Sequence, residues 1–277
     1  MKSVTRAIDQ FIAKDYIPTI LRVALGLIFI IGGFKLAFHA DPSALAAGYT
    51  DPASGWISPV FVELINNTLR MEVSLFLQIQ GWIEMLLGLA LVFGIFTSVV
   101  AIIVGLLYWS FTIANPVAGQ IRLSRDIALM GLCFALALAG SGALSLDRWI
   151  GHAPNRLGER KNAILLLIRL SLAYTFLASA IFTGGALSNH LNSTLPLPLV
   201  FLLGLLLAVG IFPKWIMGIA FLWMLYLMPV NLFEKGFYMG LDSVKRELGF
   251  LAGSLVYMLV AFVSGQDRWA WPRPRAG

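Results

Sequence analysis

One acidic residue lies in the middle of an apolar run of this chain. Glu84 stands within the apolar stretch 75–94. A carboxyl group near the centre of a membrane helix costs about 2.5–3.5 kcal/mol on insertion scales, so it normally faces the bundle interior and has a partner. Such a carboxyl group can hold and release a proton, which makes Glu84 the candidate catalytic residue. A structural ion pair with Arg22 or Lys35, or a position near the membrane interface, are the alternative interpretations.

Four charged side chains could form a binding site for a small anion. They are Arg125, Arg122, Lys35 and Asp126, which we expect near the outer side of the first half of the bundle. Planar guanidinium groups suit oxyanions because they donate two parallel hydrogen bonds. Anchoring of lipid headgroups is the competing explanation for the basic residues. Stabilisation of a helix dipole explains Asp126 equally well, since it stands in a first helical turn.

Aromatic and sulfur-containing residues limit the cofactors that the chain could hold. Tyr108 and Trp109 offer surfaces that could stack on the ring of a dissociable quinone, although plain packing is the commoner role of such residues. The chain has one cysteine, Cys133, and three histidines that fall in or next to predicted loops. We therefore expect no disulfide, haem, iron–sulfur cluster or metal site.

The elements that position these residues are apolar helices. The 277 residues are 59% hydrophobic and 12% charged, whereas a soluble domain carries about 25% charged residues. Apolar runs of about 20 residues predict an all-α integral membrane protein with about eight transmembrane helices. The predicted spans are 17–38, 75–94, 97–114, 126–144, 163–183, 197–212, 214–232 and 247–264. The net charge of +6 lies mainly in short loops, where it sets topology and does not indicate nucleic-acid binding.

Landmarks of the first half recur in the same order in the second. Gly94-Ile95-Phe96 corresponds to Gly210-Ile211-Phe212, and Asp147-Arg148-Trp149 corresponds to Asp267-Arg268-Trp269. Such recurrence indicates an internal duplication. We predict two parallel four-helix-bundle repeats, the first over residues 1–150 and the second over 163–277, joined by a cytoplasmic linker over 151–162.

The distribution of basic residues predicts the orientation in the membrane. Lysine and arginine favour the cytoplasmic side, which puts both termini in the cytoplasm of a bacterial or archaeal cell, in a multi-pass protein of the inner (cytoplasmic) membrane. The long loop over residues 39–74 then lies outside the cytoplasm and occurs in the first half only. A lid or a partner-docking element is one interpretation of this loop, and a surface elaboration is the other.

Short motifs of the first half resemble the DoxX/DoxD family of small four-helix membrane proteins. The residues that carry the resemblance are Arg22 to Leu27, Gly33-Phe34-Lys35, Glu84 with Gly88, Gly94-Ile95-Phe96, Arg125-Asp126 and Gly140 to Asp147. The second half resembles a diverged copy that lacks counterparts of Lys35 and Glu84. The best-defined member of the family is the small DoxD subunit of thiosulfate:quinone oxidoreductase. The resemblance therefore implies oxidation of thiosulfate to tetrathionate, with electrons passed to membrane quinone and usually with a DoxA partner.

Three functions follow as hypotheses of different classes. The first is a membrane subunit of a quinone-linked sulfur-compound oxidoreductase, in which Arg125, Arg122 and Lys35 hold thiosulfate and Glu84 manages a proton. The second is a non-enzymatic accessory subunit of a larger respiratory or photosynthetic complex that binds lipid or quinone. The third is a transporter. We expect a lipid bilayer around the protein, a membrane or extracytoplasmic protein partner and possible homo-oligomers.

Overall fold

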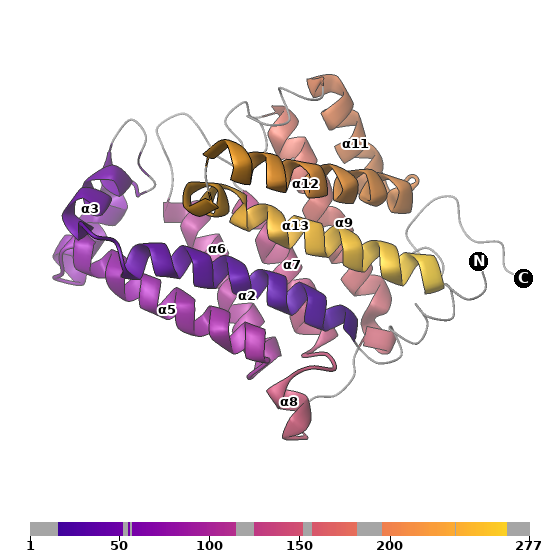
Figure 1. Cartoon of the computed structure of the whole chain (residues 1–277), viewed down its shortest axis with the longest axis horizontal. Helices are drawn as coiled ribbons and strands as arrows, with labels where there is room; N and C mark the ends of the chain where they lie inside the picture. The colour runs from indigo at the N-terminus through magenta and orange to yellow at the C-terminus, as the bar shows by residue number, and fades with distance from the viewer. Residues whose placement is uncertain are drawn as a thin grey trace, which may run out of the picture.

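The computed structural model describes residues 16–51, 55, 57–114, 125–151, 157–181, 196–235 and 237–264, and the regular structure within these ranges is helical (Figure 1). The long helices are α2 (Tyr16–Ala37), α5 (Val73–Phe93), α6 (Thr97–Ala114), α7 (Arg125–Ala139), α9 (Leu157–Ile181), α11 (Leu197–Val209), α12 (Pro213–Lys235) and α13 (Phe237–Ser264). Short elements lie in two loops: α3 (Pro42–Thr50), α4 (Pro59–Glu63), the π-helical turn η1 (Leu64–Thr68) and α8 (Leu146–Trp149).

The lengths and compositions of the long helices confirm an all-α, multi-pass membrane protein. Among the described residues, five helices are long and apolar enough to cross a bilayer: α2, α5, α6, α9 and α12. The helices α7 and α11 are apolar but shorter. Helix α13 has 28 residues and carries several charged residues in its first half. Such charges inside a bundle need neighbours that compensate them.

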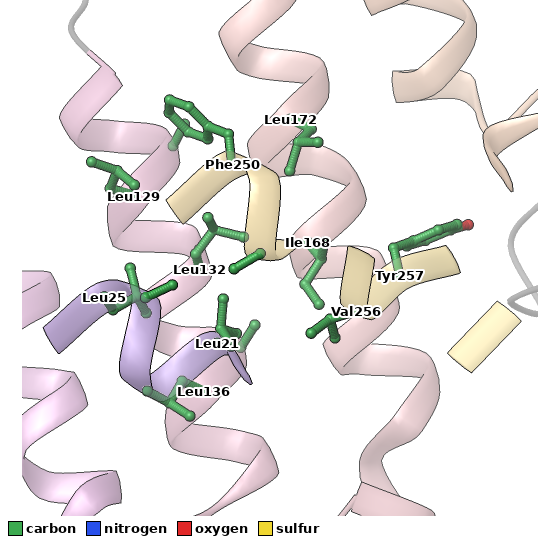
Figure 2. Packing of buried hydrophobic residues seen from close by; sticks show 14 of the residues in the cluster. Leu21, Leu25, Leu129, Leu132, Leu136, Ile168, Leu172, Phe250, Val256 and Tyr257 are labelled. Carbon is green, nitrogen blue, oxygen red and sulfur yellow. The ribbon is translucent and has the colours of Figure 1, made fainter. Parts of the chain in front are cut away.

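The core of the protein is built by helices from both halves of the chain. Helix α2 packs mainly on α5 and α13, whereas α9 packs mainly on α7 and α11. The pairs α6 with α7 and α12 with α13 complete the arrangement. Figure 2 shows the buried side chains where α2, α7, α9 and α13 meet, among them Leu25, Leu132, Leu172 and Val256. The fourth long helix of each half thus lies against the first long helix of the other half.

Glycines allow α2 and α5 to lie in close contact along their length. A carbon atom added at Gly26 would lie 2.7 Å from the carbonyl oxygen of Gly88, and one at Gly33 would lie 2.5 Å from that of Gly81. Real carbon atoms do not approach a backbone oxygen so closely, so any side chain at these positions forces the helices apart. Close backbone approach at small residues is a typical way to pack helices in a membrane.

Replacing Gly88 by valine is expected to separate α2 from α5. Overpacking of this kind costs about 1–3 kcal/mol, and occasionally more, because neighbouring backbone must shift. Thermal unfolding of the purified protein in detergent measures the loss. Gly48→Ala is the matched control, since an added carbon at Gly48 has no neighbour within 4 Å. Equal melting temperatures for Gly88→Val and the wild type would contradict the tight packing described here.

The Gly-Ile-Phe turn between α5 and α6 is held by residues of the following loop. Gly94 is left-handed, with φ 71°, and ends α5 as glycine commonly does. The Asp147 carboxylate accepts hydrogen bonds from the backbone N–H groups of Phe96 and Thr97, at 2.7 and 2.8 Å. The buried Arg22 guanidinium lies against Gly94 and donates to the Leu144 carbonyl oxygen. The recurring Asp-Arg-Trp motif therefore starts, in the first half, with the residue that caps α6.

Two helices begin well before the predicted positions. Helix α13 begins at Phe237, not at residue 247, because the charged segment that we interpreted as a loop continues the helix. This places Lys245 and Arg246 two turns inside α13. Helix α9 begins at Leu157, within the predicted linker 151–162. Arg122, the linker segment 152–156 and the second Asp-Arg-Trp motif lie outside the described residues.

Candidate functional site

Glu84 lies inside the bundle, as its sequence context predicts. Its side chain is 7% exposed, and Gln80, one turn earlier on α5, donates a hydrogen bond from Nε2 to Glu84 Oε1 at 2.8 Å. Arg22 lies at the end of α5, beside Gly94, so the structure excludes Arg22 as the partner of Glu84. One oxygen of the carboxyl group is thus held by an amide of its own helix.

The second carboxyl oxygen faces a gap in α2 that a glycine leaves open. A carbon atom added at Gly32 would lie 3.1 Å from Glu84 Oε2 and 3.4 Å from Lys245 Nζ. Gly32 is itself buried. The carboxyl group of α5 and the ammonium group of α13 therefore approach one another over the bare backbone of α2, and Glu84 interacts electrostatically with Lys245 and Arg246.

A second acid and a second cation complete the cluster. Arg246 Nε lies 3.4 Å from Asp126 Oδ1, and the Asp126 side chain is almost entirely buried. Asp126 stands in the first turn of α7, where the helix dipole also favours a negative charge. We call Glu84, Asp126, Lys245 and Arg246 the charged cluster. It joins α5 and α7 of the first half to α13 of the second.

Tyr108 brings a hydroxyl group to the same region from α6. Its side chain is 2% exposed, and its hydroxyl oxygen makes no hydrogen bond within the described part of the chain. It interacts electrostatically with Asp126, Arg246 and Glu84. The ring packs edge-to-face on Phe29, with centroids 5.2 Å apart. A buried hydroxyl group without a partner is uncommon, and it can serve a ligand that enters the cluster.

The first part of the long loop comes near Arg246 of the cluster. Helix α3 begins at Asp41, whose carboxylate accepts a hydrogen bond from the Ala44 N–H at 3.0 Å. Leu45 of α3 packs with Leu36 of α2 and Leu77 of α5. Tyr49, near the end of α3, interacts electrostatically with Arg246. The end of α3 therefore lies near the charged cluster.

A backbone contact fixes the same loop to the end of α6. The N–H group of Ser58 donates to the carbonyl oxygen of Ala114 at 2.9 Å, and the N–H group of Ile57 donates to that of Tyr49 at 2.9 Å. These bonds tie the segment that follows α3 to the end of α3 and to the end of α6.

The structure brings together some of the predicted site residues and separates others. Glu84, Asp126 and Tyr108 lie in or beside the charged cluster. Trp109 is 53% exposed on the outer surface of α6, so it does not share a ring-stacking site with the buried Tyr108. Lys35 is half-buried in the last turn of α2. Arg125 begins α7, but its side chain, like all of Arg122, lies outside what the structure describes.

Lys245, Arg246 and Gln80 are the residues that sequence reasoning missed. Gln80 stands four residues before Glu84 and could have been found from helical spacing. The position that matches Glu84, ten residues before the second Gly-Ile-Phe turn, is Val200, which is fully buried in the apolar core. Among the described residues, no group of three or more His, Cys, Asp or Glu side chains could hold a metal ion.

The fold and the cluster define a multi-pass membrane protein with a charged site buried inside its helical bundle. The DoxX family model matches residues 17–114, so the chain contains a DoxX segment and the family resemblance of its first part is confirmed. The segment contains Glu84 and Tyr108, whereas Asp126, Lys245 and Arg246 lie beyond it. No curated protein matches the chain, and no solved structure does either.

Proposed function

We propose that this protein is the membrane subunit of a quinone-linked oxidoreductase that oxidises a sulfur compound, with thiosulfate as the substrate. The observation that carries the proposal is the buried Glu84 carboxyl group, which lies beside two cations in a segment that matches the DoxX family. An acid at this depth is costly and usually serves a function. The reaction itself is proposed from the resemblance to the DoxX family.

The reaction balances in electrons and protons. Two thiosulfate dianions join through a new sulfur–sulfur bond to give one tetrathionate dianion and two electrons. The two electrons and two protons convert one quinone into one quinol. Glu84 would deliver protons to the quinone oxygens and regain them from water. The electrons pass either directly to quinone or through a protein partner of the DoxA type.

The cations and the aromatic residue take separate roles in this proposal. Arg246 and Lys245 would attract the substrate anion, together with Arg125, Arg122 and Lys35. A guanidinium group suits an oxyanion because of its planar donors. Tyr108 would donate a hydrogen bond from its hydroxyl group to a quinone oxygen. The exposed Trp109 would contact the quinone ring only while the quinone enters from the lipid.

An internal duplication and a defined orientation belong to the same proposal. The two Gly-Ile-Phe turns share their backbone conformation, with φ 71° and 86° at Gly94 and Gly210, and 47° and 48° at Phe96 and Phe212. Matching helix pairs in the two halves add support. We propose that both termini face the cytoplasm, that the protein lies in the cytoplasmic membrane, and that a membrane or extracytoplasmic partner binds it.

Anaerobic reduction of a short-chain quinone by the purified protein, with and without thiosulfate, tests the function. Mass spectrometry of the co-purifying proteins identifies a partner. Thiosulfate-dependent quinol formation supports the proposal. No quinol formation, in a preparation that retains its co-purifying proteins, contradicts it.

The second candidate is a non-enzymatic accessory subunit, in which the charged cluster only holds helices together. The ion pair between Asp126 and Arg246 favours this function, because the two charges already compensate one another. Co-purification with a larger respiratory or photosynthetic complex, without thiosulfate oxidation, would support this second function.

A further inference from the structure

A glycine on α2 makes room for the end groups of both Glu84 and Lys245. Gly32 of α2 leaves the space in which Glu84 Oε2 and Lys245 Nζ both lie, at 3.1 and 3.4 Å from where its side chain would begin. Helix α13 packs along α2 and carries Lys245 to this point. An alanine carbon at position 32 would be tight against Glu84 Oε2 and in ordinary contact with Lys245 Nζ.

Several described side chains surround Glu84. Its own helix presents Gln80, which carries no charge. Among the described side chains, the charged and titratable groups that interact with Glu84 are Asp126 of α7, Tyr108 of α6, and Lys245 and Arg246 of α13, with Glu247 and Tyr49 reached through Arg246. Because Arg246 lies 3.4 Å from Asp126, its charge is largely offset there. Lys245 is then the cation best placed to act on Glu84.

We infer that Lys245 is a positioning residue that favours the charged form of Glu84 against the cost of its burial, so that the working site is assembled from both halves of the chain. The inference rests on the proposed function in assigning Glu84 a proton-transfer role. It goes further in naming the residue that controls this role. It also means that the DoxX segment, residues 17–114, contains the acid but not the group that governs it.

Labelling with dicyclohexylcarbodiimide tests the inference without any need for enzyme turnover. This apolar reagent takes up the proton of a carboxylic acid, and the carboxylate oxygen then bonds to its central carbon, so only protonated carboxyl groups react. The adduct is measured at Glu84 by peptide mass spectrometry over a range of pH, with the full-length protein in detergent. Glu84→Gln removes the reacting group and shows which signal belongs to it.

Lys245→Met is expected to extend the labelling of Glu84 to higher pH. An opposite charge within about 4–6 Å changes the protonation midpoint of a carboxyl group by about one to three pH units, so a shift of this size is expected. Lys245→Arg keeps the charge and should restore the wild-type profile. Lys214→Met is the matched control, because Lys214 lies over the Trp215 ring at the start of α12.

Coincident profiles for Lys245→Met and the wild type would overturn the inference, and so would an equal shift in Lys214→Met. If Lys245→Met does not assemble, Lys245→Gln replaces it, since it also removes the charge but keeps a polar side chain. A shift in the same direction then supports the inference, and an unchanged profile overturns it. A shifted labelling profile in a protein without thiosulfate-dependent quinone reduction would reject the proposed function and leave the role of Lys245 standing.

Discussion

Glu84→Gln is expected to abolish thiosulfate-dependent quinone reduction while the protein still assembles. Glutamine has nearly the same shape as glutamate and can keep a hydrogen bond with Gln80, but it has no proton to transfer. General acid–base catalysis contributes about 100- to 10,000-fold to a rate, so a loss of at least about 100-fold is expected. Anaerobic quinol formation measures the rate, and size-exclusion chromatography in detergent checks the assembly.

The matched control for this prediction is Glu63→Gln, because Glu63 is exposed at the end of the short helix α4. It should retain the wild-type rate. Wild-type turnover in Glu84→Gln would remove Glu84 from the mechanism. In that case the charged cluster would keep only a role in stability.

Asp126→Ala is expected to cause the largest loss of stability among single changes in the cluster. It removes the carboxylate that lies 3.4 Å from Arg246 Nε, and the guanidinium group then loses this compensation inside the bundle. Removing one member of a buried ion pair costs about 3–5 kcal/mol. The side chain of Arg246 keeps some exposure, which favours the lower end of that range. Thermal unfolding in detergent measures the change.

A double variant separates the pair from other effects of the substitution. Asp126→Ala combined with Arg246→Met removes both charges and should recover much of the lost stability, because replacing a buried pair by apolar residues is often neutral. Asp41→Ala, which removes an exposed helix cap, gives the scale of an ordinary surface change at about 1 kcal/mol. A double variant less stable than Asp126→Ala would show that the two residues do not act as a pair.

The acids of the site could be predicted from the sequence, but the cations could not. Glu84 is recognisable because the cost of an acid inside an apolar helix is the same in any membrane fold. Lys245 and Arg246 fall in a polar stretch that we predicted to be a loop, and their role appears only once α13 continues through it and packs on α2. That packing joins residues more than 200 positions apart in the chain, and no local pattern encodes it.

The helices themselves were predicted more fully than their contacts. Apolar runs define spans because the bilayer requires internally bonded backbone over a fixed length. The contact between α2 and α5 depends instead on Gly26 and Gly33 facing Gly81 and Gly88. Both pairs are spaced seven residues apart, so the pattern was present in the sequence. The glycine pattern can be interpreted as a helix contact only when the two helices are known to be neighbours.

The crossed packing of the two halves has a consequence for how such a site can arise. In an assembly of two identical four-helix chains, any acid placed like Glu84 would occur twice, and so would any lysine placed like Lys245. Within one continuous chain the two copies are free to differ. Here the position that matches Glu84 is Val200, which is buried in the apolar core. The cation Lys245, which interacts with Glu84, lies on α13. In this chain the acid and the cation that acts on it lie on helices from different halves, so each half supplies only part of what holds charge inside a membrane.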